Sequence, residues 1–152
     1  MKKIFGVIGG STCSEEIYEI AYEIGRNIAK SGNILICGGL GGVMEAACKG
    51  AYEEGGLTVG ILPGNSKEEA NKWVRLPIVT GIGEARNVII IKSSDIVIAI
   101  DGEYGTLMEL ALCGKIKKPL IKVKVPWKID IGVEAKDAKT AVEMALNYLK
   151  EI

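Results

Sequence analysis

Short runs of aliphatic residues alternate along this chain with longer amphipathic segments, and several of the runs end directly in a glycine-rich turn. Strands that alternate with helices in this way favour a parallel sheet covered by helices on both faces. The expected strands are residues 3–8, 34–37, 57–62, 77–80, 96–100 and 119–123. The expected helices are residues 14–30, a segment through Met44, Ala47 and Ala51, and residues 83–92, 105–113 and 138–149. The pattern predicts a Rossmann-like three-layer αβα sandwich with a mostly parallel sheet, formed by residues 1–152 as a single domain.

The composition agrees with an aliphatic core and argues against a nucleic-acid partner. Hydrophobic residues make up 48% of the chain but aromatic residues only 5%. Runs rich in Ile, Val and Leu are typical of parallel strands that are buried on both faces. Nineteen basic residues balance nineteen acidic ones. Because a nucleic-acid-binding domain normally carries a clear excess of positive charge, we expect no nucleic-acid partner.

The cysteines and the missing histidine limit the chemistry available to the chain. Four cysteines are widely spaced without a Cys-x-x-Cys pair, and there is no histidine. We therefore expect free thiols in a reducing cytoplasm, no metal site, and carboxylates in any acid–base role. No apolar run approaches the about 18 residues that a membrane-spanning helix requires, so no membrane association is expected.

Three glycine-rich turns are candidates for a ligand site. They comprise residues 9–12, 38–42 and 101–106, and each joins an expected strand to an expected helix. In open α/β sheets, ligands bind beyond the carboxyl ends of the strands. Glycines let the backbone approach a ligand closely, and the amides of the following helix attract an anion. The turn at 38–42 lacks the Gly-Lys-Ser/Thr of a phosphate-binding P-loop and the spacing of a dinucleotide fingerprint.

Two charged side chains fall beside these turns. Glu109 follows Gly105 by about one helical turn, where it could reach a ligand or simply interact with the helix dipole. Arg86 falls early in an expected helix, where a cation is unfavourable for the dipole. An unfavourable placement beside a candidate site indicates a functional role for the residue. Taken alone, however, Arg86 would be interpreted as an ordinary surface arginine.

Four motifs in this order resemble the LOG superfamily. They are Gly-Gly-Leu-Gly-Gly-Val-Met-Glu-Ala-Ala from Gly38, Ile-Leu-Pro-Gly from Ile61, Gly-Glu-Ala-Arg-Asn from Gly83 and Gly-Glu-Tyr-Gly-Thr-Leu-Met-Glu from Gly102. This superfamily, also labelled lysine decarboxylase-like, includes cytokinin-activating phosphoribohydrolases and molybdenum-cofactor carrier proteins. It also includes a bacterial branch that this sequence resembles most closely.

The resemblance implies a site and two alternative functions. In the hydrolases, an arginine and a glutamate that match Arg86 and Glu109 cleave the N-glycosidic bond of a nucleoside 5′-monophosphate. The alternative is a non-catalytic carrier or sensor of a nucleotide or a pterin-type cofactor such as molybdenum cofactor. Neither alternative requires a bound cofactor for its chemistry, and the resemblance implies a homodimer or higher homo-oligomer. The expected ligand- or phosphate-binding residues are Gly9, Gly10, Ser11, Gly38, Gly39, Gly41, Gly42, Val43, Met44, Pro63, Gly64, Asn87, Gly102, Gly105 and Thr106.

The sequence departs from the hydrolase pattern at three positions. Asp101 and Glu103 replace a proline and a glycine, and Asn87 replaces the lysine that usually follows the arginine. Two extra carboxylates would repel a phosphate unless they point outward or contact hydroxyl groups. We therefore expect the turn at 38–42 to hold the phosphate and the turn at 101–106 to contact hydroxyls or a sugar. Trp73 lies in the polar stretch 66–76, expected to be a loop or short helix near the site, and could stack on a base, cap a loop or contact a second subunit.

Overall fold

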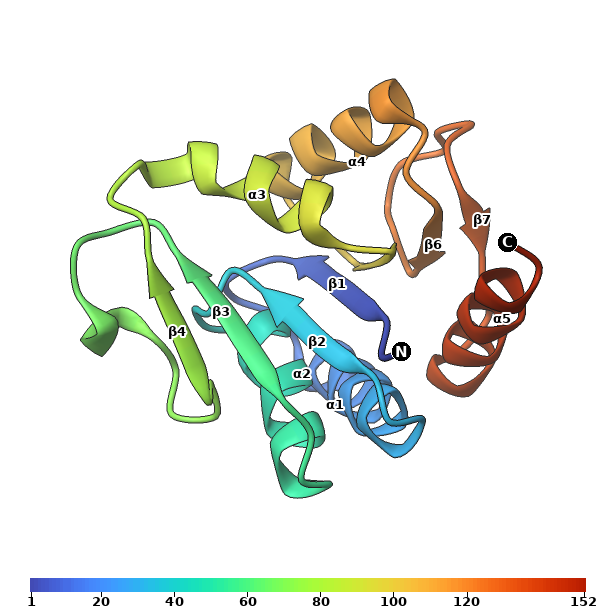
Figure 1. Cartoon of the computed structure of the whole chain (residues 1–152). Coiled ribbons are helices and arrows are strands. Elements are labelled where there is room, and N and C mark those ends of the chain that lie inside the picture. Colours follow the sequence, from blue (N-terminus) through green and yellow to red (C-terminus); the bar gives the residue numbers. More distant parts are fainter.

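The computed structural model describes residues 1–152 and forms an α/β sandwich around one sheet (Figure 1). The strands are β1 (Ile4–Gly9), β2 (Ile34–Cys37), β3 (Thr58–Leu62), β4 (Leu76–Val79), β5 (Ile96–Ile100), β6 (Leu120–Val123) and β7 (Val133–Glu134). The α-helices are α1 (Glu15–Lys30), α2 (Val43–Glu53), α3 (Arg86–Ser93), α4 (Tyr104–Ile116) and α5 (Ala138–Lys150). Two short 3₁₀ turns, η1 (Lys67–Glu69) and η2 (Gly83–Ala85), complete the chain.

The order of the strands places a switch point beside β1. The seven strands run β4-β3-β2-β1-β5-β6-β7, and all neighbouring strands pair in parallel. The chain moves outward from β1 through β2 to β4 and then crosses to the other side of β1 with β5. In parallel sheets this reversal opens a crevice at the carboxyl ends of the two strands, where ligands bind. The expected Rossmann-like fold is confirmed, with a sheet that is entirely parallel.

Helices cover both faces of the sheet, as Figure 1 shows: α1, α2 and α5 lie on one side, and α3 and α4 on the other. Each face has its own aliphatic core, in which the side chains of a given strand point alternately to the two layers. Phe5, the single phenylalanine, lies fully buried under α1, α2 and α5. Cys37 and Cys48 are also fully buried there, with their sulfur atoms 3.4 Å apart.

The two helices α1 and α2 pack through glycines. A methyl group at Gly25 would overlap the carbonyl of Ala47, and one at Gly50 would overlap the carbonyl of Tyr22. The helix backbones therefore lie in direct contact at both points. Because α2 begins at the glycine-rich turn after β2, this contact also determines where the first residues of α2 lie.

The structure differs from the sequence prediction mainly near the chain's end. The strand predicted at 119–123 is not the last one, because the short strand β7 pairs with β6 through Ile121 and Val133. Helix α4 begins at Tyr104 rather than Gly105 and continues to Ile116, beyond the predicted end at Cys113. The predicted helix 83–92 begins instead as the 3₁₀ turn η2 and becomes α-helical only at Arg86. None of the helices combines the length and apolar character needed to cross a bilayer.

Candidate functional site

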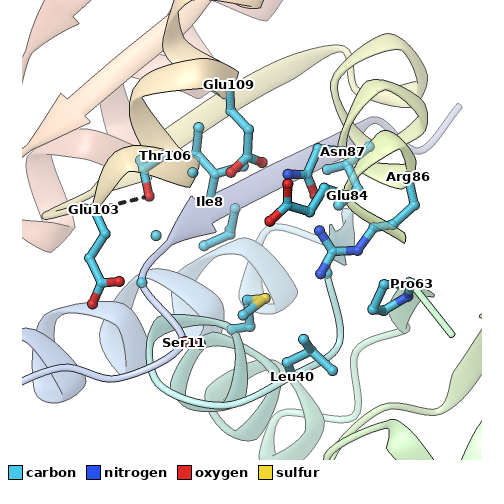
Figure 2. Close-up of a pocket in the computed structure, with 17 residues that line it drawn as sticks. Ile8, Ser11, Leu40, Pro63, Glu84, Arg86, Asn87, Glu103, Thr106 and Glu109 are labelled. Atoms are coloured by element: carbon cyan, nitrogen blue, oxygen red, sulfur yellow. Dashed lines mark hydrogen bonds between the residues drawn. The ribbon is translucent and has the colours of Figure 1, made fainter. Parts of the chain in front are cut away.

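A cavity of about 320 Å³ lies at the switch point, beyond the carboxyl ends of β1 and β2 and under α3 and α4. In Figure 2, Arg86, Asn87 and Glu84 approach it from one side, whereas Glu103 and Thr106 approach from the other. The β1–α1 and β2–α2 turns form its floor. The cavity is thus built from all three glycine-rich turns that the sequence singled out.

The β1–α1 and β2–α2 turns are locked together by their backbones. The amide of Val43 donates a hydrogen bond to the carbonyl oxygen of Gly10 (3.0 Å). Gly42 adopts a φ of +59°, and a side chain there would collide with the same Gly10 carbonyl. Glycine is therefore required at residue 42 both for the turn and for the close approach of the two segments.

The first turn of α2, whose residue Met44 lines the cavity, has backbone amides without an acceptor in the chain. No side chain caps this helix. The amide of Val43 is bonded to Gly10, and that of Ala46 to the carbonyl of Gly42 (3.0 Å). The amides of Met44 and Glu45 lie between these two, where no preceding turn of helix supplies an acceptor. Free amides at the positive end of a helix form an anion site.

Arg86 is buried without an anionic partner. It is only 8% exposed, its Nε has no hydrogen-bond partner, and neither of the two ion pairs in the chain involves it. Its guanidinium lies against the β2–α2 turn, because a methyl group at Gly38 would come within 2.7 Å of Nη2. Burial lowers the pKa of the arginine, and the Coulomb attraction of Glu109 partly offsets that effect. A buried guanidinium with free donors fits a ligand that brings negative charge.

Glu109 faces the same cavity from α4. It is 9% exposed and forms no ion pair with Arg86. Burial raises its pKa to about 7, against the opposing attraction of Arg86. A carboxyl group with this pKa can carry or release a proton near neutral pH.

The raised pKa of Glu109 makes the stability of the protein depend on pH. Because the folded-state pKa of about 7 lies above the ordinary value of 4.5, the stabilisation is complete below pH 4.5 and is lost as the pH rises through 7. The slope should approach about 1.4 kcal/mol per pH unit between these values. Urea denaturation from pH 5 to pH 7.5 measures it, with Glu109→Gln as the variant in which this contribution disappears. Equal pH slopes in the two proteins would contradict the assignment.

Glu103 connects two of the turns across the mouth of the cavity. Its Oε1 accepts a hydrogen bond from Thr12 Oγ1 (3.4 Å), and its backbone amide donates to Thr106 Oγ1 (3.4 Å; Figure 2). Asp101 does not line the cavity, and its amide is bonded to the carbonyl of Val123 (2.9 Å). Of the two extra carboxylates, one therefore lies outside the cavity and the other contacts a hydroxyl group.

The structure brings most of the expected site residues together. Those that line the cavity are Gly9, Gly10, Ser11, Gly38, Met44, Pro63, Arg86, Asn87, Gly105, Thr106 and Glu109. The others shape the turns without lining it, and they are Gly39, Gly41, Gly42, Val43, Gly64 and Gly102. Whether each of these residues contacts the ligand stays a prediction.

Two features of the site were not expected from the sequence. Glu84 lines the cavity because the 3₁₀ turn η2 places it on the same side as Arg86, two residues later. Its place inside the Gly-Glu-Ala-Arg-Asn motif was the available signal. Trp73 does not reach the cavity but packs edge-on against Tyr52 of α2, with ring centres 5.4 Å apart.

The fold and the site together define a Rossmann-like ligand-binding protein whose cavity lies at the switch point of a parallel sheet. The chain belongs to the SLOG cluster4 family, whose sequence model matches residues 2–151. An uncharacterised protein of Archaeoglobus fulgidus is 46% identical over 143 residues, which cover 94% of this chain and 91% of the relative.

Two solved structures of molybdenum-cofactor proteins are similar over nearly the whole chain. The molybdenum cofactor binding protein of Rippkaea orientalis has a TM-score of 0.91 and 35% identity and covers 98% of both chains. The Moco carrier protein of Chlamydomonas reinhardtii has a TM-score of 0.90 and 34% identity and covers 100% of both chains. The resemblance to the LOG superfamily and its carrier-like members is thereby confirmed. DNA processing protein A of Helicobacter pylori, at 17% identity and a TM-score of 0.72, shares the fold alone.

Proposed function

We propose that this protein binds molybdenum cofactor, or a similar phosphorylated pterin, and holds it intact as a carrier. The single observation that carries the proposal is the buried Arg86, whose guanidinium faces the cavity with no anionic partner in the chain. Leaving such a charge unpaired is costly, so a ligand that supplies the missing anion is bound strongly.

The phosphate of the ligand would lie between Arg86 and the first turn of α2. The guanidinium offers a planar set of donors, and the amides of Met44 and Glu45 offer two more. Charge-assisted bonds and the helix dipole act in the same direction here. This arrangement needs no P-loop lysine.

The rest of the cavity suits a ligand rich in hydrogen-bond donors. Three carboxyl groups line it, those of Glu84, Glu103 and Glu109. A carboxylate accepts hydrogen bonds and repels a second anion, so it favours amino, ring N–H or hydroxyl groups. A pterin ring carries several N–H donors, and the two molybdenum-cofactor proteins share this fold over their whole length.

Cofactor loading tests the proposal, with Gly105→Ala as the variant. A methyl group at Gly105 meets no protein atom within 4 Å, yet the residue lines the cavity. We expect the wild-type protein to retain molybdenum and a fluorescent pterin oxidation product after purification from cells that make the cofactor. The alanine should stabilise α4 by about 0.5–1 kcal/mol and weaken cofactor binding about tenfold.

Thermal unfolding and molybdenum content measure these two opposite effects. An empty wild-type protein that also fails to take up added cofactor would refute the carrier role. Unchanged loading of a folded Gly105→Ala protein would show that the cofactor binds elsewhere.

A second candidate function is cleavage of a nucleoside 5′-monophosphate, and Glu109 favours it. In that reaction the base leaves C1′ of the ribose and takes up a proton, and water oxygen bonds to C1′. A buried carboxyl group with a pKa of about 7 could stabilise the cationic sugar or move the proton. Incubation with a panel of nucleoside monophosphates tests it, because only the hydrolase releases free base.

The proposal includes a homodimer or higher homo-oligomer. Apolar side chains stand exposed on the outer surface of α3 and α4, among them Val88 at 41% and Met108 at 65%. They border a hollow that Glu109 and Asn87 reach from the other side. Large exposed apolar side chains beside one another are typical of a subunit contact.

A further inference from the structure

We propose that Glu103 selects the ligand by its ring, accepting hydrogen bonds from two adjacent N–H groups such as the amino and ring N–H edge of a pterin or a guanine. The ring would lie in a hollow beside the main cavity, between Tyr104 and Trp127. This inference rests on the proposed function, because the phosphate must first be held at Arg86.

Glu103 belongs to two hollows at once. It lines the main cavity with Thr106 and Glu109, and it lines an adjoining hollow whose other walls are Tyr104 and Trp127. A ligand held by its phosphate in the main cavity can therefore extend past Glu103 into this second hollow. Of all the side chains that line the main cavity, Glu103 alone also lines the second one.

The carboxylate of Glu103 has free capacity to accept hydrogen bonds. Its carboxylate accepts a hydrogen bond from the hydroxyl of Thr12, at 3.4 Å from Oε1, and forms a capping box with the backbone amide of Thr106, but no cation forms an ion pair with it. Two carboxylate oxygens can accept two parallel N–H groups, as they do with arginine. The amino and ring N–H groups of a pterin or guanine present such a parallel pair.

The walls of the second hollow suit a flat ring. Tyr104 is 83% exposed at the start of α4. Trp127 is half-buried, and part of its side chain packs against the core under α3 and α4. Aromatic faces contact planar heterocycles favourably and with little regard to their substituents. The aromatic pair would therefore supply affinity, and Glu103 would supply the choice between rings.

GMP and IMP are the probes that test this division of roles. They share the phosphate, the sugar and the ring N–H, but only GMP carries the amino group next to it. We expect the wild-type protein to bind GMP at least about tenfold more tightly than IMP, because one charge-assisted hydrogen bond distinguishes them. Equilibrium dialysis with chromatographic measurement of the intact nucleotide gives both affinities.

Three variants separate Glu103 from its surroundings. Glu103→Gln should reduce the preference for GMP over IMP to about threefold or less, mainly because its affinity for GMP falls. Tyr104→Leu should lower the affinities for GMP and IMP by a similar factor, so the preference for GMP should remain. Glu143→Gln, at an exposed position on α5, should change neither affinity.

The outcomes distinguish this inference from the proposed function. Equal binding of GMP and IMP by the wild-type protein overturns the inference, and so does a preference that survives in Glu103→Gln. Failure of both nucleotides to bind overturns it as well. In each of these cases the carrier role is judged separately, by whether the protein takes up molybdenum cofactor.

Discussion

Replacing Arg86 by methionine is expected to weaken binding of the phosphorylated ligand by about 100-fold or more while leaving the free protein at least as stable. Removing one partner of a buried, hydrogen-bonded charge pair costs about 2–5 kcal/mol of binding free energy. The free protein has no such pair at Arg86, since its guanidinium lies buried without an anion. Replacing an unpaired buried charge by an apolar side chain of similar length removes a desolvation cost.

Molybdenum content after cofactor loading and urea denaturation of the free protein measure the two effects. Arg75→Met is the matched control, because Arg75 lies over the ring of Tyr52 (3.8 Å) and outside the cavity. It should leave loading unchanged. Arg86→Lys should fall between the wild type and Arg86→Met, since lysine keeps the charge but loses the planar set of donors. Full loading of Arg86→Met would exclude the proposed phosphate position.

Replacing Gly50 by alanine is expected to destabilise the protein by about 3 kcal/mol or more. The added methyl group would overlap the backbone carbonyl of Tyr22, and neither helix can rotate a backbone atom away. For a chain of 152 residues this corresponds to a decrease of roughly 10 °C in Tm. The change should also reduce ligand binding in the folded fraction, because α2 would move and carry the amides of Met44 and Glu45 with it.

Thermal unfolding measures the loss of stability, and Gly105→Ala is the control. Both changes add one methyl group to a helical glycine, but only the one at Gly50 meets a backbone atom. A Tm for Gly50→Ala within about 2 °C of the wild type would mean that α1 and α2 are not in direct backbone contact.

Two of the inner strands, β2 and β5, could be predicted from the sequence residue by residue, and the central strand β1 was predicted one residue too early. Strands β2 and β5 match the predicted ranges because strands buried on both faces read as unbroken aliphatic runs. Strand β7 could not be found in this way. It has only two residues, both exposed, and it exists because Val133 pairs with Ile121 of a neighbouring strand.

The end of α4 shows how a local signal can be misleading. Gly114 directly follows the predicted end at Cys113, but it lies inside the helix, where a methyl group would come within 2.8 Å of Ile131. The left-handed residue that follows the helix is instead Lys117, with a φ of +57°. Close packing, rather than chain termination, therefore explains the glycine.

The location of the site was more predictable than its composition. A parallel sheet brings the segments after β1, β2, β4 and β5 to one edge whatever their sequence, so Arg86 after β4 and Glu109 after β5 could be placed there in advance. The contribution of Glu84 depends on a 3₁₀ turn, and the contact between Glu103 and Thr12 joins residues 91 positions apart. Neither relation is encoded in a local sequence pattern.

The backbone contacts between the β1–α1 and β2–α2 turns give the cavity two different sides. One side is formed by these turns and depends mainly on backbone geometry, and the other is formed by side chains and can vary. The contacts consist of the hydrogen bond from Val43 to Gly10 and the close approach of Gly42, and neither depends on the identity of a side chain beyond glycine. The charged side chains that line the cavity come instead from η2, from α3 and from α4 with its capping residue Glu103. A substitution on that side at a residue other than Arg86 can therefore change what the protein recognises without moving the place where the phosphate would bind. Proteins with this architecture can therefore come to recognise different ligands through few mutations while the turns after β1 and β2 stay unchanged.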